Sequence, residues 1–356
     1  MPQSQREVLD QSAVIRYLDL PVIAPSFDDR GNRMFAIYAA HSSMDDPLSA
    51  LRIGDQPEPI IPKGFVRVRV THASLNRHDL FTLRGITAHA EPIKFPMILG
   101  NDGAGTLDDG TPIVIYPVLG GEFWRGDETC DPDWHIFSEK VAGTFADYVV
   151  MPARNAIPLP PGISAADASV LGTAWLTAYR ALFTKSNLRP GQRLLVQGAS
   201  GGMSTALIQL GRAAGFEVWA TSRNAKGKAL AMKLGAHQVF DANEPLPQKV
   251  DAVVDSIGAA SLTHSIVSTV RGGTVVITGV TTGMNVNIAL LPVLSGQVNL
   301  RGSIMGTRDD MENMIHFLVH QGLKPEVGQI LPMEQAASAF RNMWNGETHG
   351  KTLFTR

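Results

Sequence analysis

The segment 198–204 has the residue types and the surroundings of a phosphate-binding turn. Its sequence GASGGMS follows the apolar run RLLVQ and opens the stretch GMSTALIQLGRAAG, so a strand, a tight turn and a helix are expected in succession. Glycines let the backbone approach a diphosphate, whose charge then meets the free N–H groups and positive dipole end of the helix. Ser204 replaces the usual third glycine and is small enough for close packing. We predict dinucleotide contacts from Gly198, Ser200, Gly201, Gly202 and Met203. The alternative is a glycine-rich turn without a ligand.

The end of the next strand distinguishes NADH from NADPH. An NAD site usually places an acidic residue there, roughly 20 residues after the glycines, to accept hydrogen bonds from the ribose. No acidic residue lies between Glu217 and Asp241. A 2′-phosphate needs cations and hydroxyl donors, which an acid would oppose. We therefore predict NADPH as the cofactor, with its phosphate held by Ser222, Arg223, Lys226 and Lys228. The lysines could instead form a solvated helix face.

Two successive patterns must provide the elements that position this turn. From Met34 onward, short strands such as FVRVRVTHASL alternate in hydrophobicity and are separated by Gly, Pro and Asp, which is typical of a barrel-like β domain. The segment 164–183 has helical spacing and begins at Ser164. From Arg193 onward, apolar strands alternate with helices. This second pattern predicts an α/β fold with a doubly wound parallel sheet covered on both faces.

The composition is that of a globular protein with two domains. The chain has 356 residues, 44% hydrophobic and 18% charged, which exceeds the usual size of a single core. A net charge of −2 gives no reason to expect nucleic acid or an anionic membrane as a partner. The single cysteine, Cys130, excludes an internal disulfide. No apolar run approaches the ~18 residues of a membrane span, and the polar start does not resemble a secretory signal. We expect a cytoplasmic protein.

Several motifs, in this order along the chain, resemble those of the medium-chain dehydrogenase/reductase superfamily. They are VTHASLNRHDLFTLRGI, PMILGNDGAGTL, LGTAWLTAYRAL, the segment from GASGG to KLGAHQVFD, and GKTLF. The resemblance extends from Met34 to Arg356 and leaves residues 1–33 as an N-terminal extension. It implies a GroES-like β-barrel catalytic domain built from residues 34–162 and 307–356, with a Rossmann NADP-binding domain over 163–306 between them. Within the superfamily, the chain resembles the zinc-free quinone oxidoreductase and alcohol dehydrogenase-like branch.

The same resemblance implies that both zinc sites of the superfamily are lost. Zinc-containing members have Cys, a His-Glu pair and often a second Cys where this chain has Asn76, Asn101-Asp102 and Thr173. A single carboxylate does not hold a catalytic zinc ion. The stretch GGEFWRGDETCDPDWHIFSEK resembles the structural-zinc lobe but keeps only Cys130. His316 and His320 have ligand spacing on a helix, but no further ligand accompanies them. We therefore predict no metal.

Further cofactor contacts are implied only by the resemblance. Thr177 corresponds to the residue beside the nicotinamide, and strand-end contacts to the ribose and carboxamide are implied for Ser256, Gly258, Gly279, Val280, Met305 and Gly306. Quinone reductases often have a Lys at the position of Gly227 and a Tyr at or beside that of Phe240, both near the 2′-phosphate. Those two departures leave the phosphate to Ser222, Arg223 and the nearby lysines.

Without a metal, hydrogen-bond donors or a proton source must stabilise the charge that hydride transfer creates on an acceptor oxygen. Asn76 is the candidate for orienting the nicotinamide ribose or the substrate carbonyl, and His78 or a water molecule for supplying the proton. Asp102 is the candidate for holding Asn76 or Arg77. The alternatives are a backbone cap for Asn76, a turn residue for Asp102 and a solvent-facing His78.

These observations predict a zinc-independent oxidoreductase that transfers hydride from NADPH to a quinone, enone or reactive carbonyl. The alternatives are an alcohol dehydrogenase-like enzyme and a non-catalytic NADPH-binding redox sensor. The strand NLRGSIMG is expected at the sheet edge, where related proteins pair, so we expect a homodimer.

Overall fold

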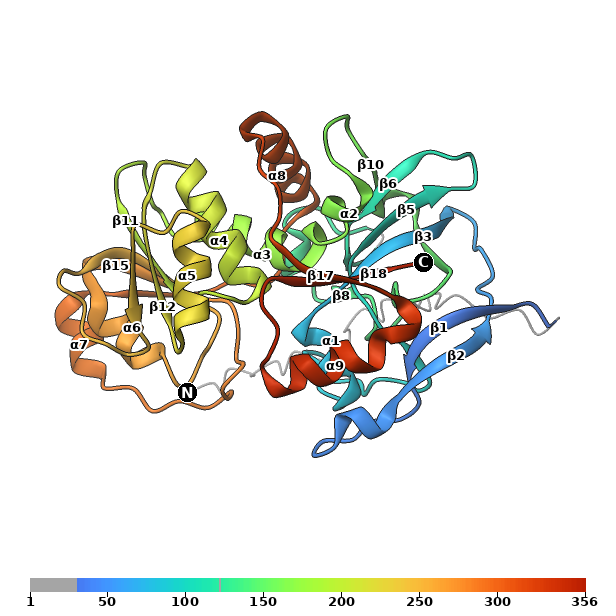
Figure 1. Cartoon of the computed structure of the whole chain (residues 1–356), viewed down its shortest axis with the longest axis horizontal. Coiled ribbons are helices and arrows are strands. Elements are labelled where there is room, and N and C mark those ends of the chain that lie inside the picture. Colours follow the sequence, from blue (N-terminus) through green and yellow to red (C-terminus); the bar gives the residue numbers. More distant parts are fainter. Residues whose placement is uncertain (1–30, 122) are drawn as a thin grey trace, which may run out of the picture.

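A computed structural model describes residues 31–121 and 123–356, which fold into two adjacent lobes (Figure 1). Nearly all of the predicted N-terminal extension therefore lies outside the described residues. One lobe holds a parallel sheet with its helices, and the other holds mainly antiparallel strands. Among the described residues, no helix combines the length and apolar character needed to cross a membrane.

The parallel sheet carries the predicted phosphate-binding turn. Its six strands pair in the order β13-β12-β11-β14-β15-β16, the doubly wound order of dinucleotide-binding domains. Their bounds are β11 Arg193–Gln197, β12 Glu217–Ser222, β13 Gln238–Asp241, β14 Val250–Asp255, β15 Thr269–Ile277 and β16 Asn299–Gly302. Strands β11 and β14 lie at the centre, where their apolar side chains are buried. The predicted α/β fold is confirmed.

Helices pack against this sheet and against the junction between the lobes. Helices α4 and α5 contact β11–β13, whereas α6 and α7 contact β14 and β15 (Figure 1). Helix α8 packs on α3 near the junction. The helical bounds are α1 Arg77–Leu83, α2 Ala165–Ala168, α3 Leu176–Arg180, α4 Gly202–Ala213, α5 Ala225–Lys233, α6 Leu262–Ser268, α7 Leu290–Gly296, α8 Arg308–Gln321 and α9 Ala336–Asn345.

The other lobe is built on a sheet that pairs β3, from the first half of the chain, with β18 at its C-terminal end. Its main path is β10-β6-β5-β3-β18-β17, with β9 also paired to β3. Smaller sheets pair β2-β1-β4 and β7-β8. The bounds are β1 Arg33–Ala39, β2 Leu51–Pro57, β3 Phe65–Leu75, β4 Met97–Ile98, β5 Gly103–Leu107, β6 Pro112–Ile115, β7 Val118–Leu119, β8 His135–Ile136, β9 Tyr148–Pro152, β10 Ala156–Pro158, β17 Val327–Pro332 and β18 Lys351–Thr355. Strand β18 runs antiparallel to β3 and pairs Thr352 with Leu75.

The helix predicted over residues 164–183 begins where expected but is not one regular helix. The Ser164 side chain accepts a hydrogen bond from the Asp167 N–H at 3.1 Å and caps α2. Two π-helical turns, Leu171–Trp175 and Ala181–Lys185, then flank α3. Such turns are frequent at functional sites because they shift side chains relative to a regular helix. Here the first one carries Thr173.

Candidate cofactor and catalytic site

The turn after β11 leaves the start of α4 open. Gly198 has a φ of 90°, the left-handed region that glycine adopts without strain. Its N–H donates to Thr221 Oγ1 at 3.1 Å, which ties the turn to β12. Gly201 is the N-cap of α4, and no side chain caps that helix. A Cβ on Gly201 would meet no described atom within 4 Å. The free N–H groups, the dipole end and the open space fit a diphosphate.

The C-terminal strand of the other lobe lies directly beside this turn. The N–H of Gly350 donates to the carbonyl of Ser200 at 2.8 Å. A Cβ on Gly202 would lie 2.5 Å from Cδ of Lys351, so this glycine makes room for the lysine. Met203 turns toward the end of β15, where its sulfur accepts the Thr278 hydroxyl at 3.5 Å. The turn is therefore in contact with both lobes.

Basic side chains lie at the tip of β12, where the sequence predicts the site of the 2′-phosphate. Arg223 and Lys226 are exposed, and neither forms an ion pair with a described residue. Desolvation and, second, the positive charge of Arg223 lower the pKa of Arg77. Desolvation and then the charge of Lys226 likewise lower the pKa of His349. The other lobe thus places Arg77 and His349 near the strand tip.

The other two residues predicted at this tip, Ser222 and Lys228, have partners within the protein. The Ser222 hydroxyl is buried and donates to the carbonyl of Asn224 at 3.1 Å. Lys228 forms an ion pair with Asp241 at 2.9 Å, which directs its ammonium to the end of β13. A Cβ on Gly227 would lie 2.4 Å from Ser222 Oγ, so a lysine at that position would disturb this turn.

The other predicted strand-end contacts lie at the same carboxyl edge of the sheet. A Cβ on Gly279 would lie 2.5 Å from the carbonyl oxygen of Ser256, and one on Gly258 would lie 3.0 Å from Cα of Val280. The two strand ends are therefore in direct backbone contact. Buried Asp255 fixes the segment that follows β14, because its carboxylate accepts the N–H of Gly258 at 3.0 Å.

Thr177 and the segment after β16 close this edge next to the other lobe. The Thr177 hydroxyl donates to the Thr173 carbonyl at 2.7 Å and lies 3.9 Å from the sulfur of Met305. Tyr116 donates its hydroxyl hydrogen to the carbonyl of Gly306 at 3.0 Å. The two positions assigned to the nicotinamide region, Thr177 and Met305, are thus in contact.

Asn76 and Asp102 both lie beside the ammonium group of Lys351. Lys351 Nζ donates to Asn76 Oδ1 at 2.6 Å and to the carbonyl of Leu75 at 3.0 Å, and it lies 3.9 Å from Asp102 Oδ2. Asp102 accepts the Ser74 hydroxyl at 2.6 Å, and no hydrogen bond joins it to Asn76 or Arg77. Burial lowers the pKa of Lys351, although the charges of Asp102 and Asp79 oppose this effect.

Asn101 and Thr173 extend this group into a continuous hydrogen-bonded network. Asn101 Oδ1 accepts Asn76 Nδ2 at 3.0 Å and the Thr173 hydroxyl at 2.9 Å. Asp79 holds the backbone beside this network in place, because its carboxylate accepts the N–H groups of Asn76 and Gly100 at 2.8 and 2.9 Å. Burial raises the pKa of Asp79 to about 6. We call Asn76, Asn101, Asp102, Thr173 and Lys351 the lysine network.

His78 lies outside the lysine network. Its Nε2 is 2.9 Å from Glu139 Oε1, and the other oxygen of Glu139 is 3.0 Å from His89 Nε2. His78 Nδ1 is buried and has no described hydrogen-bond partner. Burial by itself would raise the pKa of Glu139, but hydrogen bonds and charges from the two histidines hold it below its usual value. No hydrogen bond links this triad to Asn76 or Asp102.

The residues at the superfamily's catalytic-zinc positions do not fit a zinc site. Asn76, Asn101 and Thr173 are hydrogen-bonded to one another, and an ammonium group stands 2.6 Å from the amide oxygen of Asn76. Zinc in proteins takes thiolate, imidazole or carboxylate ligands, and amides or hydroxyls are poor substitutes. Within residues 31–121 and 123–356, no cluster of His, Cys, Asp and Glu has the arrangement of a metal site.

Sequence reasoning missed three residues that the structure brings to the site, Lys351, His349 and Glu139, and it did not connect Arg77 with the tip of β12. GKTLF contributed only to the resemblance, because nothing local shows that its lysine side chain reaches Asn76, 275 positions away. The available signal was a lysine at the start of the short strand KTLFT, since a lysine that becomes buried needs partners.

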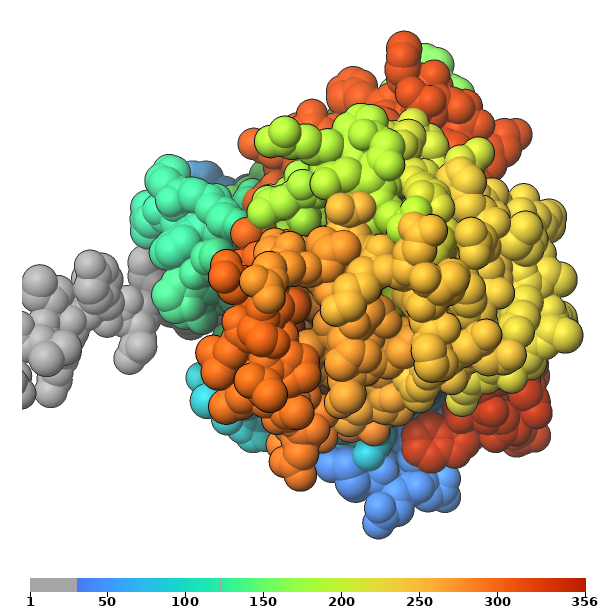
Figure 2. All heavy atoms as spheres, turned by 90° about the vertical axis from the view of Figure 1, so that its left-hand side faces the viewer, coloured from blue at the N-terminus to red at the C-terminus, as the bar shows by residue number. Residues whose placement is uncertain are grey.

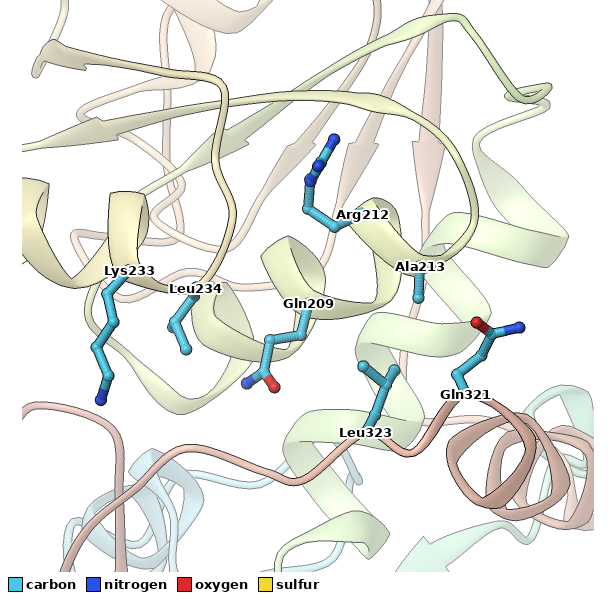
Figure 3. A pocket seen from close by; sticks show the side chains of 7 residues that line it. All are labelled: Gln209, Arg212, Ala213, Lys233, Leu234, Gln321 and Leu323. Carbon is cyan, nitrogen blue, oxygen red and sulfur yellow. The ribbon is translucent and has the colours of Figure 1, made fainter.

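A surface hollow of about 440 Å³ lies away from this site (Figure 3). It is lined by residues of the C-terminal half of α4, the end of α5 and the segment after α8, among them Gln209, Lys233 and Leu323. The phosphate-binding turn is at the opposite end of α4. Lys233 is also paired with Glu326 at 3.1 Å. The hollow therefore does not belong to the site described above.

Comparison with known proteins identifies both lobes. The sequence profile of the alcohol dehydrogenase GroES-like domain matches residues 62–161, and that of zinc-binding dehydrogenases matches residues 202–320. Mouse (Mus musculus) quinone oxidoreductase is 26% identical over 311 residues, covering 83% of this chain and 89% of that protein. A zinc-type alcohol dehydrogenase-like protein of Schizosaccharomyces pombe is 27% identical over 329 residues, covering 83% and 92%.

A solved structure has the same fold over nearly the whole described chain. It is a crystal structure of an NAD-dependent alcohol dehydrogenase, with a TM-score of 0.84 and 29% identity. The match covers 91% of this chain and all of the other.

Proposed function

Since the chain belongs to the medium-chain dehydrogenase/reductase superfamily, we propose that it is a zinc-independent, NADPH-dependent reductase of quinones, enones or reactive carbonyls. The observation that carries this proposal is the lysine network, in which two amides and a hydroxyl stand at catalytic-zinc positions and the ammonium group of Lys351 contacts one of the amides. Without a metal ion, the protein polarises its substrate only through hydrogen bonds and a fixed charge. Electron-poor acceptors suit that limitation better than simple alcohols.

The choice of NADPH is supported by the charges at the tip of β12. Arg223 and Lys226 have no described ion-pair partner, and Arg77 and His349 approach from the other lobe. Exposed cations without an acidic partner favour a bound dianion. Lys228 contributes less because Asp241 already neutralises it.

The rest of the site binds and orients the reactants. The open start of α4 holds the diphosphate, and Thr177 with Met305 limits the position of the nicotinamide, which supplies the hydride when bound. Asn76 and Asp102 act as positioning residues around Lys351. His78, held by Glu139, is the candidate for passing a proton through its unpartnered Nδ1.

The functional unit in this proposal is a homodimer formed along β16 and α7. Strand β16 is at the edge of the parallel sheet, and Leu290, Leu291 and Leu294 of α7 are 65–73% exposed. This segment lies at the surface on the face shown in Figure 2. A second copy would cover both the open edge and the leucines. Light scattering on the purified chain should give twice the mass of a monomer, and a monomer would contradict this arrangement.

The function is tested by comparing the oxidation of NADPH and NADH with a panel of quinones, enones and aldehydes. We expect turnover with NADPH and less than one zinc ion per two chains by metal analysis. Turnover of simple alcohols with NAD⁺ and bound zinc would instead favour a zinc-type alcohol dehydrogenase. Tight NADPH binding without any oxidation would favour a redox sensor.

The cofactor assignment is tested by Arg223→Asp. Losing a charge-assisted contact and adding a repulsive charge should reduce the preference for NADPH over NADH by on the order of tenfold to a hundredfold. Lys233→Asp is the matched control, because Lys233 is at the far end of α5 and pairs with Glu326. An unchanged cofactor preference in Arg223→Asp would refute the assignment.

A further inference from the structure

The lysine network has a fixed direction that begins at Lys351. An ammonium group can only donate hydrogen bonds, so the oxygen of the Asn76 amide must face it, as the 2.6 Å contact shows. The Asn76 amide nitrogen then lies on the other side and donates to the carbonyl of Ser74 at 3.1 Å and to Asn101 Oδ1 at 3.0 Å. Both hydrogens of the Asn76 amide are used within the protein, which leaves none for a substrate.

The orientation of Asn101 follows from that of Asn76. Asn101 Oδ1 receives Asn76 Nδ2 and the Thr173 hydroxyl, so its own amide nitrogen points away from both. Rotating the amide by half a turn would set two NH₂ groups against each other and remove the acceptor from Thr173. The amide therefore cannot flip while Lys351 is charged.

This orientation leaves an amide NH₂ group without a partner. Asn101 is fully buried, and its Nδ2 forms no hydrogen bond with any described residue. Leaving a buried donor unpaired is costly, so such a group at a functional site requires an explanation. Asn101 lies next to Thr173, and Thr173 precedes Thr177 by one helical turn. Ala174, the residue after Thr173, is 3.6 Å from the Cβ position of Gly202 in the phosphate-binding turn.

We propose that Asn101 Nδ2 is the hydrogen-bond donor that receives the acceptor oxygen of the substrate, with Lys351 and Thr173 as the residues that position it. This role rests on the proposed function. During reduction, the acceptor carbon receives the hydride with both electrons, and the displaced π electrons move along the carbonyl or enone system onto oxygen. A fixed amide donor stabilises that charge where it develops. A proton from His78 or from water then completes the product.

The main test is Asn101→Asp, which keeps the size of the side chain and both acceptor roles but removes the NH₂ group. We expect kcat to fall by about 100-fold, the loss typical of one oxyanion donor. The dissociation constant of NADPH, measured by its fluorescence, should stay within about twofold because Asn101 does not touch the turn. Thr173→Val, which frees one side of the amide, should lower kcat by about tenfold, and Thr173→Ser should restore it.

An infrared measurement separates this role from a structural one. Cyclohexenone bound with NADP⁺ should show a carbonyl stretch shifted to lower frequency in the wild type, and Asn101→Asp should lose that shift. An active wild type whose kcat and carbonyl stretch are unaffected by Asn101→Asp would overturn the role of Asn101 and leave the proposed function intact. A wild type that reduces no acceptor in the panel would overturn both.

Discussion

The phosphate-binding turn and the lysine network lie side by side but are built in different ways. The turn uses consecutive residues from Gly198 to Met203, and its chemistry resides in backbone N–H groups at the start of α4. The lysine network uses five side chains from separate segments, and Lys351 joins it only when β18 pairs with β3. One region is therefore set by local sequence and the other by tertiary structure.

This difference affects how each region can respond to substitution. Backbone N–H groups stay in place when most side chains are changed. The orientation of the Asn76 amide, in contrast, depends on Lys351, and that of the Asn101 amide depends on Asn76 and Thr173. Lys351 belongs to both regions, since its stem fills the space that Gly202 leaves and its ammonium group orients Asn76. Changes at or around Lys351 therefore test whether the two regions are separable.

Lys351→Met should have the largest effect. It keeps the apolar stem but removes the donor, so Asn76 can rotate and the direction of the network is lost. We expect kcat to fall by at least about 100-fold in steady-state assays. Lys351→Arg should recover part of this loss because a guanidinium group also only donates. Equal activity in the Met and Arg variants would show that direction is irrelevant.

From the burial of Lys351 we also expect a loss of activity at alkaline pH. Burial lowers the pKa of Lys351, so its ammonium group should lose its proton below the usual range for lysine. A neutral amine can accept a hydrogen bond, which frees Asn76 to rotate. The negative charges of Asp102 and Asp79, which face the ammonium group, oppose this pKa shift but do not reverse its sign. In a pH profile, kcat should fall as pH rises, and Lys351→Arg should move that fall to higher pH.

The contrast between the two regions also sets what the sequence could predict. The fold class and the glycine turn follow from hydrophobic periodicity and a contiguous motif, and the structure contains both. Asn76 and Asp102 were found as positions in motifs, but their common partner was not. Lys351 is far from both in sequence, and its reach depends on the register of β18 against β3. The partner of His78 was missed for the same reason, since Glu139 is 61 residues away.

Replacing Gly202 or Gly201 with alanine should affect the two regions differently, and the effect on activity should be intermediate in size. Gly202→Ala places a methyl group 2.5 Å from Lys351 Cδ, so it should lower the melting temperature of the cofactor-free protein and reduce kcat by about tenfold. Gly201→Ala meets no described atom within 4 Å, so it should leave that temperature unchanged and mainly weaken NADPH binding. Identical profiles for the two variants, by differential scanning fluorimetry and fluorescence titration, would contradict the distinction.

His78→Gln should have the smallest effect on catalysis, because no hydrogen bond connects its triad to the lysine network. We expect kcat to change by less than about fivefold if water can replace His78 as the proton source.

The stability of the protein should respond more clearly to a change in this triad. The histidines hold the pKa of Glu139 low, so Glu139 stabilises the fold above its unfolded pKa and this contribution is lost as pH falls through its folded pKa. Melting curves from neutral to acidic pH should therefore show a shallower fall for Glu139→Gln than for the wild type. A large loss of kcat in His78→Gln with unchanged melting would instead place His78 in the proton-transfer step.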